Sequence, residues 1–250
     1  MTFPNNNLNT KTKLAMLISG GGTTMEAILL ACKSGKLPNI EPVLVISSND
    51  KAGGLERAKN VGISVEDIIV IDPKNWKSRE EFGEKIISEC EKRGVNLVGQ
   101  YGWIIKTPDN VVEKFKGRIV NQHPGPLDNG RPDFGGPGMY GMRVMQARLD
   151  FVKRTGHDFW TEATAHLVIS EFDKGAILRR KQVEIFPNET PESLQKKLLP
   201  IEHEVQIETL HDFSEGHVVT FFREKPLIEK REEEILEKCK EAAKKVYPNG

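Results

Sequence analysis

Asn121 and His123 are the residues whose types and spacing are best suited to chemistry in this sequence of 250 residues. They belong to Asn121-Gln122-His123-Pro124, at the carboxyl end of a predicted strand, which is the edge of an open α/β sheet where ligands bind. Residues two apart in an extended segment point the same way, so the carboxamide and the imidazole would project into one space. The carboxamide offers an N–H donor without a change of protonation, and imidazole exchanges a proton near neutral pH. A structural histidine is the alternative, but the position at this edge favours a catalytic role.

A glycine-rich turn, Gly20-Gly21-Gly22, precedes Thr23 and Thr24 between a predicted strand and a predicted helix. Glycine lets a ligand approach the backbone, and the first turn of a helix offers unpaired N–H groups with partial positive charge. The turn lacks the Gly-Lys-Ser/Thr of a P-loop and the third glycine of the dinucleotide fingerprint. We therefore expect a site for a single phosphate. A tight turn with Thr23 as the helix N-cap is the alternative without a ligand.

Asp173 is a third candidate, in a predicted turn at 170–175 between two strands. A carboxylate beside His123 would raise the pKa of the imidazole by favouring its charged form, and it could relay a proton through water. Aspartate shortly before glycine is also common in turns, so a purely local role is the alternative. The remaining histidines lack metal-ligand spacing with a cysteine or an acidic residue, and we expect no metal site.

Short apolar runs alternate with helical patterns through the first half of the chain. Strands are expected at 13–19, 42–48, 67–72, 95–100 and 118–122, with helices at 23–34, 54–60, 78–93 and 108–116. Such alternation is typical of parallel βαβ units with helices on both faces of the sheet. The expected fold class is therefore α/β, with a Rossmann-like, mainly parallel sheet.

The pattern changes after Pro124. Residues 125–141 contain too many glycines and prolines for a regular element, and we expect a surface loop there. A helix at 142–154 should follow, and then an antiparallel strand pair at 162–169 and 176–186 that extends the sheet. The last expected elements are a long helix at 191–213, a strand at 217–222 and a charged helix at about 229–246.

Composition limits the classes of protein that this chain can represent. Basic and acidic residues number 36 each, so no net charge draws the protein to nucleic acid or to a membrane surface. The 3 cysteines form no C-x-x-C motif, which predicts neither a disulfide framework nor a zinc site. Neither a secretion signal nor an apolar run of about 18 residues is present. A cytoplasmic protein without nucleic-acid or membrane partners is expected.

Five segments together resemble a known family. They are LISGGGTTMEAILLACKSGK, SSNDKAGGLERAKNVGI, SREEF, the Asn121-x-His123-Pro124 element and HLVISEFDKG, in this order. In order and spacing they resemble the glycinamide ribonucleotide formyltransferases of purine biosynthesis, which belong to the formyltransferases that use 10-formyltetrahydrofolate. The likeness implies a formyltransferase domain at 13–222. An extended or disordered segment at 1–12 would precede it, and a charged helical tail at 223–250 would follow.

The resemblance implies transfer of a formyl group from 10-formyltetrahydrofolate to the amine of glycinamide ribonucleotide, without a metal ion. Asn121, His123 and Asp173 would be catalytic. Asn121 and a protonated His123 would stabilise the oxyanion, and Asp173 would keep His123 charged. Gly22, Thr23 and Thr24 would bind the phosphate, and Glu202 would bind the ribose. The folate would contact Arg79, Gly102, Trp103, Ile104, Ile105 and Asn121. The implied partners are small molecules, with the protein a monomer or a homodimer.

Departures from the family's pattern fall on substrate-facing positions and leave the acceptor open. Thr24 stands where the family usually has an asparagine, Trp103 where an arginine is common, and Leu199 where a polar contact is common. Residues 125–128 also open an unusual loop. Another amine, such as an amino sugar nucleotide, or water in a formyltetrahydrofolate hydrolase, is an alternative acceptor, whereas neutral charge disfavours a tRNA-bound methionine. A nucleotide-binding module that has lost catalysis is the third choice.

Overall fold

The computed structural model describes residues 11–248 and 250 and contains a seven-stranded sheet. The strands are hydrogen-bonded in the order β3-β2-β1-β4-β5-β6-β7. The pairs from β3 to β5 are parallel, and β6 pairs with β7 antiparallel, which confirms the expected fold class. Most of the predicted N-terminal segment at 1–12 lies outside the described residues. The chain forms two compact units, one from residues up to 121 with 206–218, the other from 122–205 with 219–250.

The first unit holds the parallel strands. They are β1 (Thr12–Ile18), β2 (Ile40–Ser47), β3 (Ile68–Val70), β4 (Leu97–Gln100) and the start of β5 (Ile119–His123). β1 lies between β2 and β4, and its residues from Leu14 to Ile18 are fully buried. Met25 and Ile28 of the following helix pack in the same core. A continuous apolar run is typical of a parallel strand that is covered on both faces.

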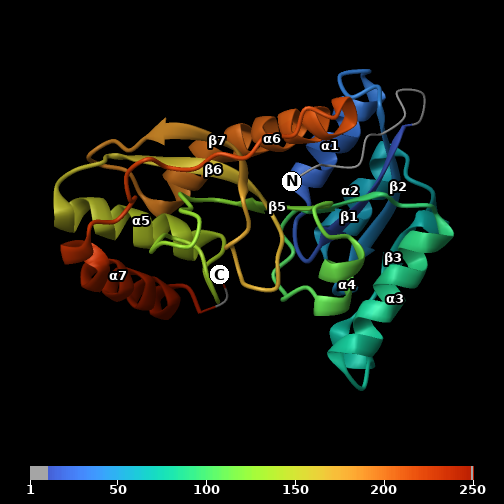
Figure 1. Ribbon diagram of the computed structural model, residues 1–250, viewed down its shortest axis with the longest axis horizontal. Coiled ribbons are helices and arrows are strands. Elements are labelled where there is room, and N and C mark those ends of the chain that lie inside the picture. The colour runs from blue at the N-terminus through green and yellow to red at the C-terminus, as the bar shows by residue number, and fades with distance from the viewer. Residues whose placement is uncertain (1–10, 249) are drawn as a thin grey trace. The chain divides into compact units, whose positions relative to one another are not determined.

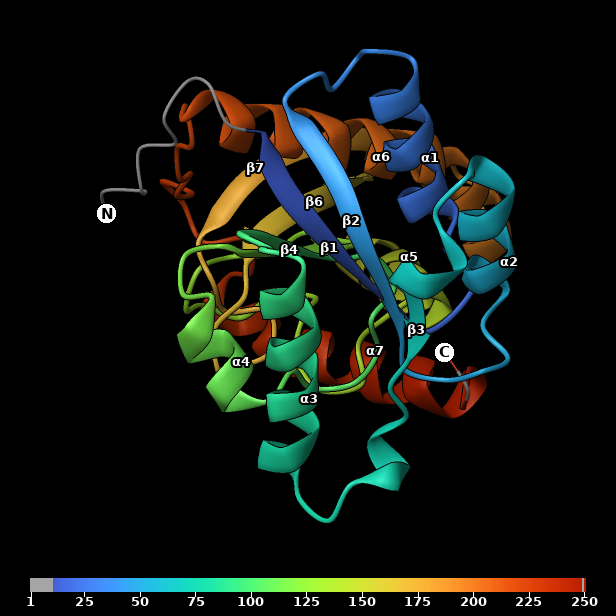
Figure 2. The ribbon, with the colours of Figure 1, turned by 90° about the vertical axis from the view of Figure 1, so that its right-hand side faces the viewer.

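Four helices cover the two faces of these strands. α1 (Thr23–Lys33) and α2 (Gly53–Val61) pack together on one face, and α3 (Arg79–Lys92) and α4 (Asp109–Lys114) pack together on the other (Figure 2). Short 3-10 helices at Val65–Asp67 and Pro73–Asn75 lie in the connections around β3. The alternation of strands and helices in the sequence predicted this layering.

The second unit combines the antiparallel strand pair with helices. It contains α5 (Met142–Thr155), β6 (Trp160–Leu167), β7 (Ile177–Glu184) and the start of α6 (Pro191–Glu215). A 3-10 turn (Lys230–Glu232) leads into α7 (Glu233–Val246), which packs against α5 (Figure 1). Leu236, Cys239 and Ala243 of α7 are buried, so the apolar side of this charged helix is covered.

Residues 217–222 form no strand, contrary to expectation. Phe221 makes an isolated antiparallel bridge to Ile177 at the start of β7, with its N–H donating to the Ile177 carbonyl oxygen at 2.8 Å. Val219 and Phe222 remain 55% and 72% exposed. The apolar side chains of this segment therefore gain too little burial to hold a longer ladder.

The loop at 125–141 has no regular element, as expected, but it is not a surface loop. Leu127, Asp128, Asp133 and Phe134 are each at most 1% exposed. Polar backbone groups in a buried loop need hydrogen-bond partners within the protein. Asp133 accepts two N–H groups of the loop, and Asp128 ties the loop to the N–H of Leu227, so the loop is a fixed part of the second unit.

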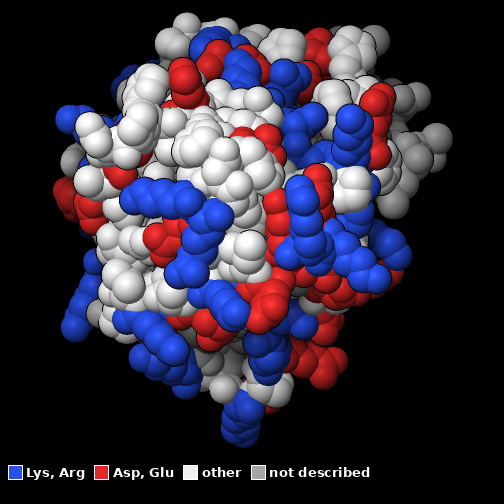
Figure 3. Space-filling view, turned by 90° about the vertical axis from the view of Figure 1, so that its left-hand side faces the viewer, with Lys and Arg blue, Asp and Glu red and all other residues white. Residues whose placement is uncertain are grey.

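Charges of both signs mix on the face shown in Figure 3. Lys and Arg side chains lie there among Asp and Glu side chains, in keeping with the equal totals of 36. This face therefore offers no broad field of one sign to a polyanion. Within the described part of the chain, the helices are too short or too polar to cross a membrane.

A histidine holds the start of the C-terminal helix. His157 lies between two carboxylates, with Nε2 2.6 Å from Glu232 Oε1 and Nδ1 3.1 Å from Asp158 Oδ2. The hydrogen bond to Glu232 raises the pKa of His157 above its ordinary value of 6.5. A group with a raised pKa stabilises the fold fully below the ordinary value, and this contribution is lost as the pH rises through the higher, folded value.

His157→Gln should therefore lower the free energy of unfolding at about pH 6 and change it less at about pH 9. The effect should stay below about 1 kcal/mol, because water screens a half-exposed imidazole. Urea unfolding of both proteins at the two pH values measures it. An equal loss at both pH values would show that the charge of His157 contributes nothing.

Candidate active site

The predicted site residues divide between the two units. The first unit holds Gly22, Thr23, Thr24, Arg79, Asn121 and the segment 102–105, and the second holds His123, Asp173 and Glu202. Asn121 and His123 both belong to β5, two residues apart. This strand therefore carries a predicted catalytic residue of each unit.

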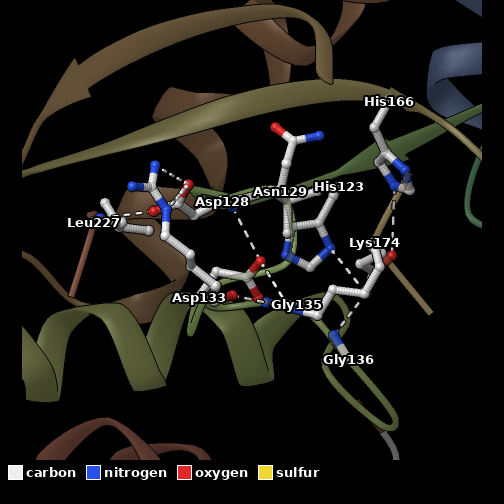
Figure 4. A network of polar contacts seen from close by, with 12 residues as sticks. His123, Asp128, Asn129, Asp133, Gly135, Gly136, His166, Lys174 and Leu227 are labelled. Carbon is white, nitrogen blue, oxygen red and sulfur yellow. Dashed lines mark hydrogen bonds and ion pairs between the residues drawn. The ribbon is translucent and has the colours of Figure 1, made fainter. Parts of the chain in front are cut away.

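His123 and Asp173 come together in the second unit, as expected. Nδ1 of His123 lies 3.7 Å from Oδ2 of Asp173, and their side chains are 3% and 11% exposed. Nε2 of His166 lies 3.4 Å from the other carboxylate oxygen, Oδ1. One buried carboxylate thus lies next to two imidazoles (Figure 4).

The backbone around Asp173 holds its carboxylate in place. Asp173 has a φ of +55°, in the left-handed region that few residues other than glycine, asparagine and aspartate adopt. Two residues later, a Cβ on Gly175 would lie 1.7 Å from the carbonyl oxygen of Leu167, so only glycine fits. The N–H of Gly136 donates to Oδ2 of Asp173 at 2.8 Å. The turn therefore fixes both the backbone and the carboxylate.

Burial reverses one expectation about His123. Although burial alone would raise the pKa of Asp173, the neighbouring imidazoles and the Gly136 N–H together lower it. The pKa of His123 is lowered as well, because burial outweighs the attraction of Asp173. The expectation that Asp173 keeps His123 charged is therefore wrong, since an imidazole 2% exposed loses more hydration than the charges of Asp173 and Asp133 replace. Near pH 7, a neutral His123 lies beside an ionised Asp173.

His166 is a site residue that the sequence reasoning set aside. Its Nδ1 lies 2.8 Å from the carbonyl oxygen of Leu167, and its Nε2 faces Asp173. The sequence spacing between His166 and possible metal ligands does not reveal its place in the site. The signal that could have found it is the strand register, which pairs His166 with Ile177 and so places it next to the turn that carries Asp173.

The glycine turn lies between β1 and α1 in the first unit, as expected. Gly22 has a φ of +72°, and a Cβ there would lie 2.7 Å from Cα of Gly54, near the start of α2. The N–H of Gly54 donates to the Gly20 carbonyl oxygen at 3.0 Å. Two glycine turns thus pack backbone to backbone, and Gly54 is a residue that the motif analysis missed.

The open side of this turn consists of backbone. Gly22 is the N-cap of α1, so the alternative with Thr23 as the N-cap is wrong. No side chain caps the first turn, and a Cβ on Gly20 or Gly21 would meet no atom within 4 Å. Thr24 is only 5% exposed, so its hydroxyl is less accessible than the backbone N–H groups. An anion can approach these N–H groups at the helix start.

The predicted folate segment is fixed to the residue after β1. Oγ of Ser19 accepts the N–H of Ile104 at 3.2 Å, and the Ser19 N–H donates to the Gly102 carbonyl oxygen at 3.0 Å. Trp103 is 7% exposed and stacks on Phe82 of α3, with ring centroids 6.3 Å apart. Its ring therefore packs against α3, while its buried Nε1 has no hydrogen-bond partner among the described residues.

Two side chains here are exposed to solvent, that of Ile104 within the segment and that of Arg79 beside it. Ile104 is 52% exposed, and Ile105 is partly buried. Arg79, at the start of α3, is exposed and donates from Nη2 to the carbonyl oxygen of Lys106 at 2.6 Å. This bond holds Arg79 beside the end of the segment, within the same unit.

Glu202 of α6 is buried beside Gln122 of β5. It is 4% exposed, and the side chain of Gln122 hydrogen-bonds to its carboxyl group. Burial raises the pKa of Glu202 to about 7. Oε1 of Glu202 and Oε1 of Gln122 are both buried, and neither has a hydrogen-bond partner among the described residues. Unpaired buried acceptors are uncommon, and the hydroxyl groups of a ligand would supply the missing donors.

Glu202 should make the protein less stable as the pH rises. The unfolded chain loses this proton near the ordinary value of 4.5, whereas the folded protein keeps it up to about pH 7. The folded state binds more protons in this interval, so the free energy of unfolding should fall across it, by at most about 3 kcal/mol. Glu202→Gln cannot ionise and should remove this part of the slope. Denaturant unfolding of both proteins from about pH 4 to about pH 8 measures the difference, and parallel curves would contradict it.

Comparison with known proteins identifies the class that this fold and site define. Residues 12–210 match the formyl transferase family, and the chain belongs to that family. The resemblance drawn from the five sequence segments is thereby confirmed at the level of the family.

The similarity to particular proteins is narrower. The chain is 32% identical over 206 residues to the chloroplastic phosphoribosylglycinamide formyltransferase of Arabidopsis thaliana, which covers 82% of this chain and 66% of that protein. It is 30% identical over 206 residues to the phosphoribosylglycinamide formyltransferase of Haemophilus influenzae, which covers 82% of this chain and 89% of that protein. The chain thus spans 66% of the length of the Arabidopsis relative.

A solved structure supports the fold directly. The crystal structure of glycinamide ribonucleotide transformylase 1 from Symbiobacterium toebii matches with a TM-score of 0.74 and 28% sequence identity. The match covers 88% of this chain and 94% of that one. The mixed sheet of this chain is therefore that of a known formyltransferase structure.

Proposed function

We propose that the protein transfers the formyl group of 10-formyltetrahydrofolate to the amine of glycinamide ribonucleotide, a step of purine biosynthesis. The observation that carries the proposal is the buried pair of His123 and Asp173, 3.7 Å apart, with His123 at the end of β5. Membership of the formyl transferase family supports the reaction type. The name of the Haemophilus influenzae relative supports the acceptor.

Asn121 stabilises the charge that forms when the amine attacks. The amine nitrogen bonds to the formyl carbon, and the carbonyl oxygen becomes an oxyanion. The carboxamide of Asn121 donates an N–H to this oxygen and needs no change of protonation to do so. A preorganised donor of this kind contributes about 3 to 4 kcal/mol to the transition state.

His123 takes up the proton that the attacking amine loses. Because the imidazole is neutral near pH 7, it can accept this proton, and the ionised Asp173 stabilises the imidazolium that forms. The charged imidazole then gives the proton to N10 of the folate as the bond from N10 to the formyl carbon breaks. The products are the formylated amine and tetrahydrofolate.

The remaining predicted residues bind the two substrates. Gly22, Thr23 and Thr24 hold the phosphate through backbone N–H groups at the start of α1. Glu202 accepts hydroxyl groups of the ribose, and its unpaired oxygen supports this role. The folate lies along Arg79 and the segment 102–105, which includes Gly102, Trp103, Ile104 and Ile105, with contact to Asn121.

Two other acceptors compete with glycinamide ribonucleotide. Thr24 and Leu199 replace residues that are common at substrate-facing positions of the family, so another amine, that of an amino sugar nucleotide, is the second candidate. Water is the third, in a formyltetrahydrofolate hydrolase. A nucleotide-binding module without catalysis is disfavoured by the buried pair of His123 and Asp173.

The test follows the release of tetrahydrofolate from 10-formyltetrahydrofolate. The purified protein is incubated with glycinamide ribonucleotide, with a nucleotide-linked amino sugar, or with neither acceptor. Release that depends on the ribonucleotide supports the proposal, and release that depends on the amino sugar assigns the second candidate. Equal release without an acceptor identifies a hydrolase. If tetrahydrofolate is not released under any of these conditions, the proposed enzyme activity is overturned.

The proposal includes the cellular location, the oligomeric state and the domain bounds of the protein. We place it in the cytoplasm as a monomer or a homodimer with small-molecule partners only, and its catalytic domain at 13–222 with a tail at 223–250. Equal numbers of acidic and basic residues, 36 each, support the absence of nucleic-acid partners. Cell fractionation tests the location, which matters because the Arabidopsis thaliana relative is named as chloroplastic. Light scattering of the purified protein tests the oligomeric state.

A further inference from the structure

The turn that carries Asp173 is hydrogen-bonded to the loop at 125–141 through three successive residues (Figure 4). These bonds run from the Gly136 N–H to the Asp173 carboxylate at 2.8 Å, from Lys174 Nζ to the Arg131 carbonyl oxygen at 3.1 Å, and from Asn129 Nδ2 to the Gly175 carbonyl oxygen at 3.1 Å. The turn and the loop therefore form one hydrogen-bonded body.

Asp133 lies at the centre of these contacts. It is 1% exposed, and its two oxygens accept three donors. Oδ1 accepts the Gly135 N–H at 3.0 Å, and Oδ2 accepts both another backbone N–H of the loop at 3.0 Å and Lys174 Nζ at 3.1 Å. Gly135 precedes Gly136, whose N–H reaches Asp173, and Lys174 follows Asp173. One carboxylate thus holds both chain segments that border Asp173.

Gly135 brings the backbone of the loop directly against the catalytic side chain. A Cβ on Gly135 would lie 2.7 Å from Cβ of Asp173. A displacement of the loop would therefore move the backbone that packs against Asp173 and, with it, the Gly136 N–H that donates to the Asp173 carboxylate.

The C-terminal segment supports the same loop from its other side. The supporting bonds run from Lys240 Nζ to the Asp133 carbonyl oxygen at 3.2 Å, from the Leu227 N–H to Asp128 Oδ2 at 2.8 Å, and from Arg223 Nε to the Leu127 carbonyl oxygen at 2.8 Å. A loop held in this way is rigid enough to fix a neighbouring side chain.

We propose that Asp133 is a positioning residue, which holds the carboxylate of Asp173 against His123 through the loop and through Lys174. The inference rests on the function proposed above for His123 and Asp173. The hydrogen bonds of the Asp133 carboxylate go to Gly135, Asp128 and Lys174 and not to His123 or Asp173, although its charge also raises the pKa of His123. An asparagine could not replace it, because the NH2 group of an amide cannot accept from an ammonium or from an N–H.

The test compares Asp133→Asn with Asp128→Asn, a matched change in the same loop. Asp128 is equally buried, but its carboxylate accepts Arg131 on Oδ1 and the Leu227 N–H on Oδ2, and neither donor borders Asp173. An asparagine at 128 keeps one oxygen for the Leu227 N–H and loses only the bonds from Arg131, so the support from the C-terminal segment remains. Asp133→Asn should lower kcat for formyl transfer by about 10- to 100-fold, with KM nearly unchanged, because small misplacement of a catalytic group is costly. Asp128→Asn should keep kcat within about threefold of wild type. Equal losses in the two variants would overturn the proposal.

A double variant separates positioning from general damage. If Asp133 acts through Asp173, the variant with both Asp133→Asn and Asp173→Asn should be no slower than Asp173→Asn alone. Losses that multiply would show that Asp133 acts independently, which overturns the proposal.

Hydrogen exchange of the Gly136 N–H tests the inference without turnover. NMR of the whole protein without substrates should show exchange at least about tenfold faster in Asp133→Asn than in wild type or Asp128→Asn. Unchanged exchange would overturn the positioning role. Faster exchange in a protein that transfers no formyl group would instead overturn the proposed function and leave the structural link intact.

Lys174→Met provides a second variant in case Asp133→Asn does not fold. It removes only the ammonium group, which is partly exposed, and leaves Asp133 its two backbone donors. A loss of kcat of about 3- to 10-fold, with faster exchange at Gly136, is expected. Wild-type kcat together with wild-type exchange would count against the proposal.

Discussion

Asp173→Asn should lower kcat for formyl transfer by about 10²- to 10⁴-fold, the range that general acid–base catalysis contributes. Asparagine has nearly the same shape and can still accept the Gly136 N–H, but it removes the negative charge beside His123 and His166. The imidazolium that forms during the reaction would then be buried without its nearest carboxylate, and only the more weakly acting charge of Asp133 would remain. Steady-state release of tetrahydrofolate measures the loss, and KM for both substrates should change much less.

The pH profile gives this prediction a second check. The charge of Asp173 raises the pKa of His123 against the larger effect of burial. Its removal should therefore shift the acid limb of the residual activity to lower pH, because a neutral His123 is the active form. Glu171→Gln, an exposed change in the same turn, is the matched control and should keep the wild-type rate. If Asp173→Asn were as active as this control, Asp173 would have no part in proton transfer.

Gly22→Ala should raise KM for glycinamide ribonucleotide by at least about tenfold. The new Cβ would lie 2.7 Å from Cα of Gly54, so the two glycine turns would have to separate. That movement displaces the N–H groups at the start of α1, and a hydrogen bond to a charged group contributes about 1.5 to 3 kcal/mol. Initial rates over a range of ribonucleotide concentrations measure KM, and kcat should change less.

Gly35→Ala is the matched control for this change. Gly35 has a φ of +78°, close to the +72° of Gly22, but a Cβ there would meet no atom within 4 Å. Gly35→Ala should therefore cost about 1 to 2 kcal/mol of stability through backbone strain and leave KM unchanged. Equal KM values in the two variants would place the phosphate elsewhere.

The parallel half of the fold could be predicted from local sequence, because its signals are contiguous. The apolar run before Gly20 predicted a strand at 13–19, and β1 spans Thr12–Ile18. The change of period after the glycines predicted α1. His123 and Asp173 could also be predicted, the first from its place at a strand end and the second from its family motif. Their distance of 3.7 Å could not, because it depends on a turn that no periodicity describes.

The residues that the sequence reasoning missed act across long separations. Asp133 bonds to Lys174 over 41 positions, within a segment whose glycines and prolines indicated only a loop. Gly54 matters because another backbone approaches it, which no property of its own segment reveals. The lowered pKa of His123 escaped prediction for a related reason. Burial depends on the atoms that surround a group in three dimensions, whereas a charge partner can be inferred from a motif.

The bonds between the loop and the C-terminal segment have a consequence for how the protein is made. Leu127, Asp128 and Asp133 take partners that lie 96, 99 and 107 positions further along the chain. During translation, His123 and Asp173 therefore leave the ribosome well before α7, the helix whose Lys240 completes the support of the neighbouring loop. Nascent chains fold as segments emerge, so the second unit passes through a stage with its core elements made and its loop still without the bonds from the C-terminal segment. Competence for catalysis should appear only after α7 has left the exit tunnel.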